Sequence, residues 1–158
     1  IKVIKNTLKK FTGIQRRLTK IFSINGREYF DDYAHHPTEI RSVLDSIKRT
    51  SKNRKIVSVF QPHRYSRIKL LKKDFACAFK NSNLVVLCPV YAAGEKIDKK
   101  YNAIDFAKLI SRESKVQVII IKDQNDLKKF FIKNLLNKEI VLCMGAGSIS
   151  KWIRNMNL

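Results

Sequence analysis

Four short apolar runs, separated by intervals of helical length, constrain the fold of this chain more than any other feature. They lie at residues 55–60, 84–88, 117–121 and 139–144 and are rich in valine, isoleucine and leucine. Strands that alternate with helices predict a mostly parallel sheet. Because the runs are apolar almost throughout, helices should cover both faces of that sheet. We therefore expect an α/β domain with three layers and a Rossmann-like sheet.

The intervals carry apolar stripes with helical spacing, which predict one buried face for each helix. Pro37 suits the first turn of the first helix, because the N–H that proline lacks would have no partner there. The predicted faces are Ile40, Val43, Leu44 and Ile47, then Leu71, Phe75, Ala78 and Phe79, and then Leu127, Phe130, Phe131 and Leu135.

One antiparallel strand pair is expected near the start of the domain. Asn25 and Gly26 separate the segments TKIFSI and REYFDDY. A type I′ turn needs a positive φ at both central residues, and Asn-Gly supplies it readily. The sheet should therefore include one antiparallel strand from an N-terminal hairpin.

The length of 158 residues suits one domain with a sizeable core. The chain begins without a methionine, and the apolar residues of its first segment follow helical spacing. We interpret residues 1–12 as a helix left from a preceding domain, and residues 13–158 as the domain itself.

The charge of the chain is strongly positive, with 33 basic against 13 acidic residues and a formal value of +20. Such a balance is typical of proteins that bind nucleic acids or anionic membranes. Here, however, lysines are scattered over almost every segment, and no nucleic-acid recognition module is evident. We expect a solvated lysine coat and no specific nucleic-acid partner, and keep a non-catalytic basic α/β binding module as an alternative.

Three cysteines, Cys77, Cys88 and Cys143, lie in apolar runs without CxxC spacing. Buried thiols in a reducing cytosol fit this pattern best. No apolar stretch approaches the roughly 20 residues that span a bilayer. We therefore predict a cytoplasmic protein without membrane insertion.

Unusual polar residues gather in the loops that should follow the strands. In an open parallel sheet, ligands bind beyond the carboxyl ends of the strands. The loops expected there are residues 31–39, 61–67, 90–95 and 144–149. The candidate site is therefore one rim of the sheet.

The first of these loops contains Asp31, Asp32, His35 and His36, a set that could suggest the divalent-metal site of a phosphoesterase. Adjacent strand residues point to opposite faces, so at most one Asp and one His converge readily. We expect no metal site from these residues. His36 is interpreted as a residue that orders the helix start, and His35 as a ligand contact.

Arg64 and Arg67 flank an aromatic residue at the end of a buried strand. Two guanidinium groups in one short loop favour an anion site for carboxylate or phosphate, and the alternative is a solvated loop pair. The GAG at residues 145–147 resembles a phosphate-binding turn, but no GxxxxGK followed by Ser or Thr occurs in the chain. We therefore expect this turn to serve tight strand-to-helix packing.

Together these motifs carry a family resemblance. DDYAHHPTEI at residues 31–40, FQPHRYSR at 60–67, VYAAGE at 90–95 and GAGSI at 145–149 look, in this order and spacing, like the UDP-N-acetylmuramate:L-alanine ligases of the Mur ligase family. FTGIQRR at 11–17 resembles the stretch that joins the central ATPase domain of that family to its C-terminal domain. Residues 96–102 depart from the usual Gly-containing turn, so the shape of that loop stays open.

The resemblance implies an ATP-dependent ligase of peptidoglycan precursor synthesis. ATP would phosphorylate the lactyl carboxylate of UDP-N-acetylmuramate with the help of Mg²⁺, and the amine of L-alanine would attack the acyl phosphate. The P-loop, the main magnesium ligands and the UDP pocket would lie on N-terminal and central domains. Residues 1–12 would be the tail of the central ATPase domain, and residues 13–158 the C-terminal, amino-acid-binding domain, inactive and without catalytic residues when alone.

The resemblance also assigns binding residues. The ATP-binding set would be Arg17 at a phosphate, Asp32 at the ribose hydroxyls and Tyr33 beside the nucleotide, and the L-alanine set would be His35, Arg64 and Arg67. Both arginines would hold the alanine carboxylate. Arg16 and Asp31 would be structural neighbours. A further alternative is the tripeptide-recycling muramate ligase, which shares the DD-aromatic-AHHPT motif.

Overall fold

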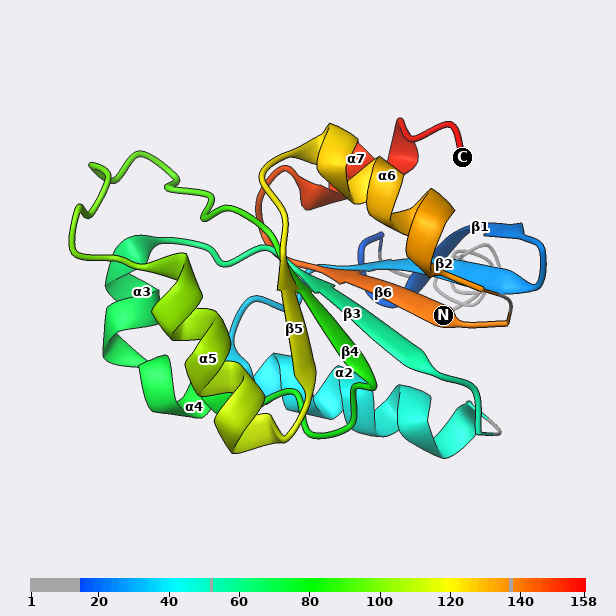
Figure 1. Ribbon diagram of the computed structural model, residues 1–158, viewed down its shortest axis with the longest axis horizontal. Coiled ribbons are helices and arrows are strands. Elements are labelled where there is room, and N and C mark those ends of the chain that lie inside the picture. The colour runs from blue at the N-terminus through cyan, green and yellow to red at the C-terminus, as the bar shows by residue number, and fades with distance from the viewer. Residues whose placement is uncertain (1–14, 52, 137) are drawn as a thin grey trace, which may run out of the picture.

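Figure 1 shows a computed structural model of the chain, which describes residues 15–51, 53–136 and 138–158. Its strands are β1 Thr19–Ile24, β2 Arg27–Asp32, β3 Ile56–Phe60, β4 Leu84–Leu87, β5 Gln117–Ile120 and β6 Ile140–Met144. They form one sheet in the order β1-β2-β6-β3-β4-β5. Only β1 and β2 pair in antiparallel fashion within this sheet. The predicted α/β fold with a mostly parallel sheet is confirmed.

The hairpin turns where the sequence predicts it. Asn25 and Gly26 connect β1 to β2 and have φ values of 51° and 78°. Both values lie in the left-handed region that a type I′ turn requires. The antiparallel strand β1 therefore forms one edge of the sheet.

Helices cover both faces of the sheet, which gives three layers (Figure 1). Their bounds are α2 Pro37–Thr50, α3 Tyr65–Leu70, α4 Lys72–Ala76, α5 Ala103–Ser114, α6 Gln124–Asn134 and α7 Ile149–Arg154. Helices α2 to α5 lie on one face, and α6 and α7 lie on the other (Figure 1). Pro37 occupies the first turn of α2, as expected.

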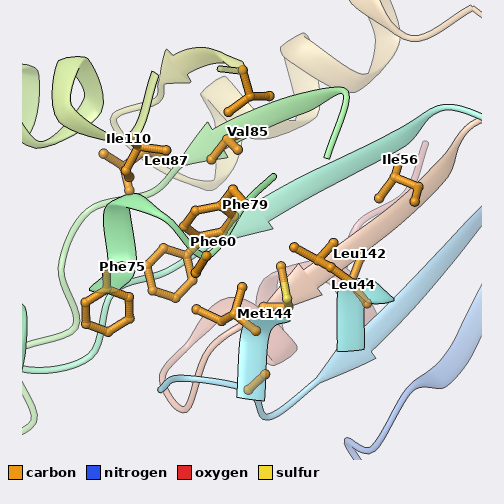
Figure 2. Close-up of a cluster of buried hydrophobic side chains, with 14 of the residues drawn as sticks. Leu44, Ile56, Phe60, Phe75, Phe79, Val85, Leu87, Ile110, Leu142 and Met144 are labelled. Atoms are coloured by element: carbon orange, nitrogen blue, oxygen red, sulfur yellow. The ribbon is translucent and has the colours of Figure 1, made fainter. Parts of the chain in front are cut away.

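Alternate strand residues feed two hydrophobic cores. Ile56 and Phe60 face the core under α2, α4 and α5, whereas Val57 and Val59 face the core under α6 and α7. This is the period of two expected of a strand. Figure 2 shows the first core, in which aromatic side chains of β3 and the α4 region meet aliphatic side chains of the neighbouring strands.

Three local expectations need correction. The stripe from Leu71 to Phe79 predicts one helix, but α3 ends at Leu70 and α4 at Ala76, with Leu71 at φ −110° between them. Strand β5 is not buried on both faces, because it is an edge strand and Ile120 is 41% exposed. Cys77 is only half-buried, whereas Cys88 and Cys143 are buried.

In the part of the chain that the structure describes, no helix combines the length and apolar character needed to cross a bilayer. The predicted tail at residues 1–12 lies outside the described residues.

Candidate functional site

The carboxyl ends of the four central strands lie side by side. Met144 at the end of β6 is the register partner of both Asp32 on β2 and Phe60 on β3, and Phe60 is paired in turn with Leu87 on β4. The loops that follow these strands therefore meet at one rim. This is the rim at which the sequence places the candidate site.

Asp31 and Asp32 diverge at the end of β2, because adjacent strand residues point to opposite faces. Asp31 is fully buried and accepts hydrogen bonds from Ser150 Oγ at 2.6 Å and Arg154 Nη2 at 2.9 Å, both on α7. Arg16 Nε approaches the same carboxylate to 3.8 Å. Asp31 therefore ties α7 and the segment before β1 to the sheet.

The two arginines before β1 have different surroundings. Arg16 donates from Nη2 to the carbonyl of Gly145 at 2.6 Å, and its guanidinium lies 4.6 Å from the centre of the Tyr33 ring. Arg17 is exposed, and its side chain makes no hydrogen bond or ion pair with the described residues. Arg16 is thus held by the fold, whereas the guanidinium of Arg17 is not, and its predicted phosphate contact stays a prediction.

The Asp32 carboxylate orders the backbone around it. Its two oxygens accept the N–H groups of Leu18 and Ala34, both at 2.7 Å, and the residue is 1% exposed. Burial raises the pKa of Asp32, and the two N–H donors and the positive charge of Arg17 partly oppose that effect. The predicted ribose contact needs an accessible acceptor, which this arrangement does not offer. That contact stays a prediction.

The start of α2 is capped by the residue that the sequence singles out. His36 is the N-cap, its side chain accepts the N–H of Thr38 at 3.4 Å, and Glu39 completes a capping box. His35 donates from Nδ1 to the carbonyl of Tyr33 at 2.9 Å. The role of His36 at the helix start is confirmed, and the ligand contact of His35 stays a prediction.

The FQPHRYSR and VYAAGE segments interlock. The N–H of Tyr91 donates to Pro62 O at 2.8 Å, and the N–H of Arg64 donates to Tyr91 O at 2.9 Å. Glu95 accepts the backbone N–H and the hydroxyl of Ser66, and this hydroxyl contact is the main cause of the lowered pKa of Glu95. The two motifs therefore form one unit that fixes the start of α3.

Arg64 is held in an unusual backbone conformation, with φ at 69°. A non-glycine residue in this region carries strain of about 1–3 kcal/mol, and such strain is concentrated at functional sites. The side chain is exposed and makes no hydrogen bond or ion pair with the residues that the structure describes. Beside it lies a shallow hollow of about 340 Å³, lined by His36, Arg64, Ser66, Arg67, Leu70 and Leu71.

The glycines of the GAG turn permit close packing. A Cβ at Gly147 would lie 2.5 Å from both Gln61 Oε1 and Tyr91 Cγ, and a Cβ at Gly145 would lie 2.8 Å from Gln61 O. Gln61 in turn accepts the N–H of Ile149 at 2.9 Å. The packing role predicted for this turn is confirmed.

A row of rings runs along the rim. Ring centres are 5.2 Å apart for Tyr33 and His35, and 5.7 Å apart both for His35 and His63 and for His63 and Tyr91. Arg67 Nη1 lies 3.1 Å from Nδ1 of His63. The row thus connects the predicted ATP-binding residue Tyr33 with the predicted alanine-binding residues His35 and Arg67. No sequence motif singles out His63, and the one local signal is its place four residues before Arg67, a spacing at which side chains near the start of a helix can meet.

The described residues contain no group of three His, Cys, Asp or Glu side chains that could hold a metal ion. Mg²⁺ prefers carboxylate oxygens in near-octahedral geometry, and Asp31 and Asp32 do not converge. The residues described here do not fit a magnesium site by themselves.

Comparison with known proteins identifies the domain. Residues 16–147 match the family model described as "Mur ligase, glutamate ligase domain". The chain belongs to the Mur ligase family. A UDP-N-acetylmuramate–L-alanine ligase of Pelagibacter ubique is 48% identical over 154 residues, which cover 98% of this chain and 33% of that protein. The corresponding ligase of Bartonella tribocorum is 37% identical over 95% of this chain and 31% of its own length.

Solved structures of the Mur ligase family share the fold. The UDP-N-acetylmuramate–alanine ligase of Thermotoga maritima superposes with a TM-score of 0.69 at 29% identity, over 94% of this chain and 30% of that one. The murein peptide ligase of Psychrobacter arcticus has the same TM-score at 18% identity, over 97% of this chain and 33% of that one. The chain thus spans about a third of the length of the relatives it matches, and corresponds to the C-terminal domain of Mur ligases.

The loop in which this Mur ligase departs from the family pattern is built around Asp98. Its side chain accepts the N–H of Lys100 at 2.9 Å, and its carbonyl accepts the N–H of Tyr101 at 3.0 Å. Asn102 then caps α5. The loop whose shape the sequence left open is therefore an aspartate turn.

Proposed function

We propose that this chain supplies the amino-acid site of an ATP-dependent ligase that joins L-alanine to UDP-N-acetylmuramate. The observation that carries the proposal is the unpaired Arg64 guanidinium beside Arg67, at the hollow next to the start of α2. A carboxylate bound there meets donors with fork geometry. The names of the relatives that are 48% and 37% identical supply the substrate pair.

In this proposal the domain contributes positioning and charge. Arg64 and Arg67 hold the alanine carboxylate and leave the amine free to attack, with His35 beside it. Arg17 contacts a phosphate of ATP, and Tyr33 lies beside the nucleotide. When bound, ATP supplies the phosphoryl group that activates the lactyl carboxylate as an acyl phosphate. The magnesium ligands are assigned to the other domains of the ligase.

The same proposal places the protein in the cytoplasm, where ATP and nucleotide sugars are made. Three free cysteines are compatible with that reducing compartment.

A tripeptide-recycling muramate ligase is the second candidate, because the murein peptide ligase shares this fold. Its amine substrate is much larger than L-alanine. A purified ligase that contains this chain should turn over L-alanine in preference to the tripeptide when both are offered. Preference for the tripeptide would replace the first proposal with the second.

The arginine assignment is tested by steady-state kinetics with L-alanine as the varied substrate. Truncation of one charged partner in a desolvated site costs roughly 2–5 kcal/mol, so Arg64→Ala and Arg67→Ala should each raise the KM for L-alanine at least about 30-fold. Arg64→Lys should recover only part of this loss, because lysine lacks the planar fork. The KM for UDP-N-acetylmuramate should change little.

Arg41→Ala is the matched control, since Arg41 is an exposed arginine on α2 without a hydrogen bond or ion pair to the described residues. It should change neither the KM for L-alanine nor the KM for UDP-N-acetylmuramate by more than about twofold, the usual effect of a surface substitution. An unchanged alanine KM in both Arg64→Ala and Arg67→Ala would end the assignment. If a basic binding module were the correct alternative, DNA binding by the chain would be strong and would fall steeply with salt.

A further inference from the structure

The contact between His63 and Arg67 defines the protonation state of His63. Nη1 of Arg67 lies 3.1 Å from Nδ1 of His63 and 3.5 Å from the carbonyl oxygen of the same residue. A guanidinium has donors only. Nδ1 must therefore accept the hydrogen bond, which requires a neutral imidazole with its proton on Nε2.

The imidazole of His63 is fixed on two sides. Its ring stacks on Tyr91 with an interplanar angle of 21° and meets His35 edge to face. Tyr91 is itself fixed by its backbone hydrogen bonds to Pro62 and Arg64 and by contact with Gly147. The rings of Tyr91 and His35, and not Arg67 alone, therefore hold Nδ1 of His63 in place as the acceptor for Arg67.

The charges around His63 favour its neutral form. Burial is the largest cause of its lowered pKa, and electrostatic interactions with Arg67, His35 and Arg64 act in the same direction. Glu95 is the opposing group and raises the pKa. Since histidine ordinarily titrates near 6.5, His63 is neutral at neutral pH.

Arg67 is the better ordered of the two arginines in the hollow. Its contacts with described residues all involve Nη1, so Nη2 and Nε remain available to an anion. The Arg64 side chain makes no hydrogen bond or ion pair with those residues, and its charge acts on His63 and Glu95 from a distance. A guanidinium that is ordered before the ligand arrives loses less entropy on binding.

We propose that His63 is a positioning residue for Arg67: the neutral imidazole holds the guanidinium that binds a small carboxylate, and protonation of His63 releases it. The identity of the carboxylate as L-alanine rests on the proposed function, whereas the His63–Arg67 contact does not. Carboxylate binding should therefore weaken below the pKa of His63.

The contact is tested by ¹⁵N NMR of the histidine rings in the 158-residue chain. His63 is one of three histidines, and its signals are identified by their loss in His63→Asn. At about pH 7.5 we expect a proton on Nε2 and none on Nδ1, with a pKa below the ordinary value of about 6.5. Arg67→Ala should raise that pKa, because it removes a positive charge and a donor. An Nδ1–H tautomer, or a pKa that Arg67→Ala leaves unchanged, would overturn the proposal.

The consequence for binding is tested with a matched pair of neutral amides in the complete ligase that contains this chain. The amide oxygen of Asn reaches approximately the position of Nδ1, whereas that of Gln reaches beyond it. His63→Asn should keep the KM for L-alanine within about twofold of the unsubstituted enzyme near pH 8. His63→Gln should raise it about tenfold or more. Equal effects of the two substitutions would count against positioning.

A pH series separates positioning from mere packing. Between about pH 8 and about one unit below the His63 pKa that NMR measures, the alanine KM of the unsubstituted enzyme should rise relative to that of His63→Asn, which has no group to protonate. A constant ratio would contradict the proposal. If even the unsubstituted enzyme failed to use L-alanine while the NMR result held, the proposed substrate would be wrong and the His63–Arg67 contact would stand.

Discussion

At the scale of single residues, the arginines of this domain fall into two groups by their partners. Arg16 and Arg154 are tied to the buried Asp31, and Arg67 is tied to His63. The side chains of Arg17 and Arg64 make no hydrogen bond or ion pair with the residues that the structure describes, although their charges act on nearby Asp32 and Glu95. A guanidinium without a hydrogen bond or ion pair at the predicted ligand-binding rim is the group we expect to meet phosphate or carboxylate. The chain's large positive charge is therefore less informative than the partners of a few arginines.

The Asp31 and Asp32 doublet allows a direct test of this distinction. Asp31→Asn should lower the free energy of unfolding of the chain by about 3 kcal/mol, because it breaks a buried charge cluster. Asp32→Asn should lower it by about 1–2 kcal/mol, since an amide oxygen can still accept one of the two backbone N–H groups. Urea denaturation of both variants measures the difference.

The functional half of the same test uses the complete ligase. There, Asp32→Asn should raise the KM for ATP and lower turnover while the enzyme stays folded, because the Asp32 carboxylate fixes the backbone beside Arg17 and Tyr33, the two other predicted ATP-binding residues. Asp31→Asn should lower activity only because less of the enzyme is folded, and it should leave the KM for ATP unchanged. The opposite result would be a smaller loss of unfolding free energy in Asp31→Asn than in Asp32→Asn, together with a larger rise in the KM for ATP. That result would exchange the roles of the two residues.

At the scale of elements, the turn between β6 and α7 is the most tightly packed part of the rim. Gly147→Ala would place a methyl group against both Gln61 and Tyr91. Overpacking of this kind typically costs 1–3 kcal/mol, so we expect a loss of about 2 kcal/mol in unfolding free energy. Displacement of Tyr91 should also disturb the His63 ring signals in NMR, because the two rings stack.

Gly94→Ala is the matched control for this turn. A Cβ at Gly94 would meet nothing within 4 Å, although its φ of 88° adds backbone strain. Its cost should be about 1 kcal/mol, without any change at His63. Equal losses, or an undisturbed His63 in Gly147→Ala, would contradict the packing role given to this glycine.

Most of the elements follow from local sequence. The four apolar runs became β3 to β6, and Asn25-Gly26 forms the predicted turn, because alternation and turn chemistry are local properties. The interruption at Leu71 was not predictable in this way. The break lets Phe75 and Phe79 pack on Phe60, and such contacts depend on tertiary structure.

The site was predictable only in part, for the same reason. The loops and their shared rim follow from strand order and motif position. The burial of Asp32 depends on the backbone N–H of Leu18, and the role of His63 depends on Tyr91. Both contacts join segments that are distant in sequence, so residue type and spacing could not reveal them.

At the scale of the whole molecule, the described domain holds binding groups without a phosphate-transfer apparatus. No GxxxxGK followed by Ser or Thr occurs in the chain, and the described residues hold no group of three metal-ligating side chains. Asp32 directs both of its oxygens to backbone N–H groups. We therefore expect the 158-residue chain to fold by itself, to unfold in one cooperative transition, and to bind ATP only weakly. It should neither hydrolyse ATP nor form an amide.

Phosphate release and amide formation by the purified chain test this expectation, together with calorimetric titration of ATP. Any weak ATP binding should decrease in Arg17→Ala and with added salt, because a single exposed guanidinium supplies a screened electrostatic contact. Arg41→Ala, at an exposed arginine on α2, should leave it unchanged and serves as the control. ATP turnover that persisted on repeated purification, and that was lost in Asp32→Asn, would show that the domain contains catalytic groups that the rim geometry does not reveal. Absence of turnover with cooperative folding would assign this domain to substrate binding and leave phosphoryl transfer to the rest of the ligase.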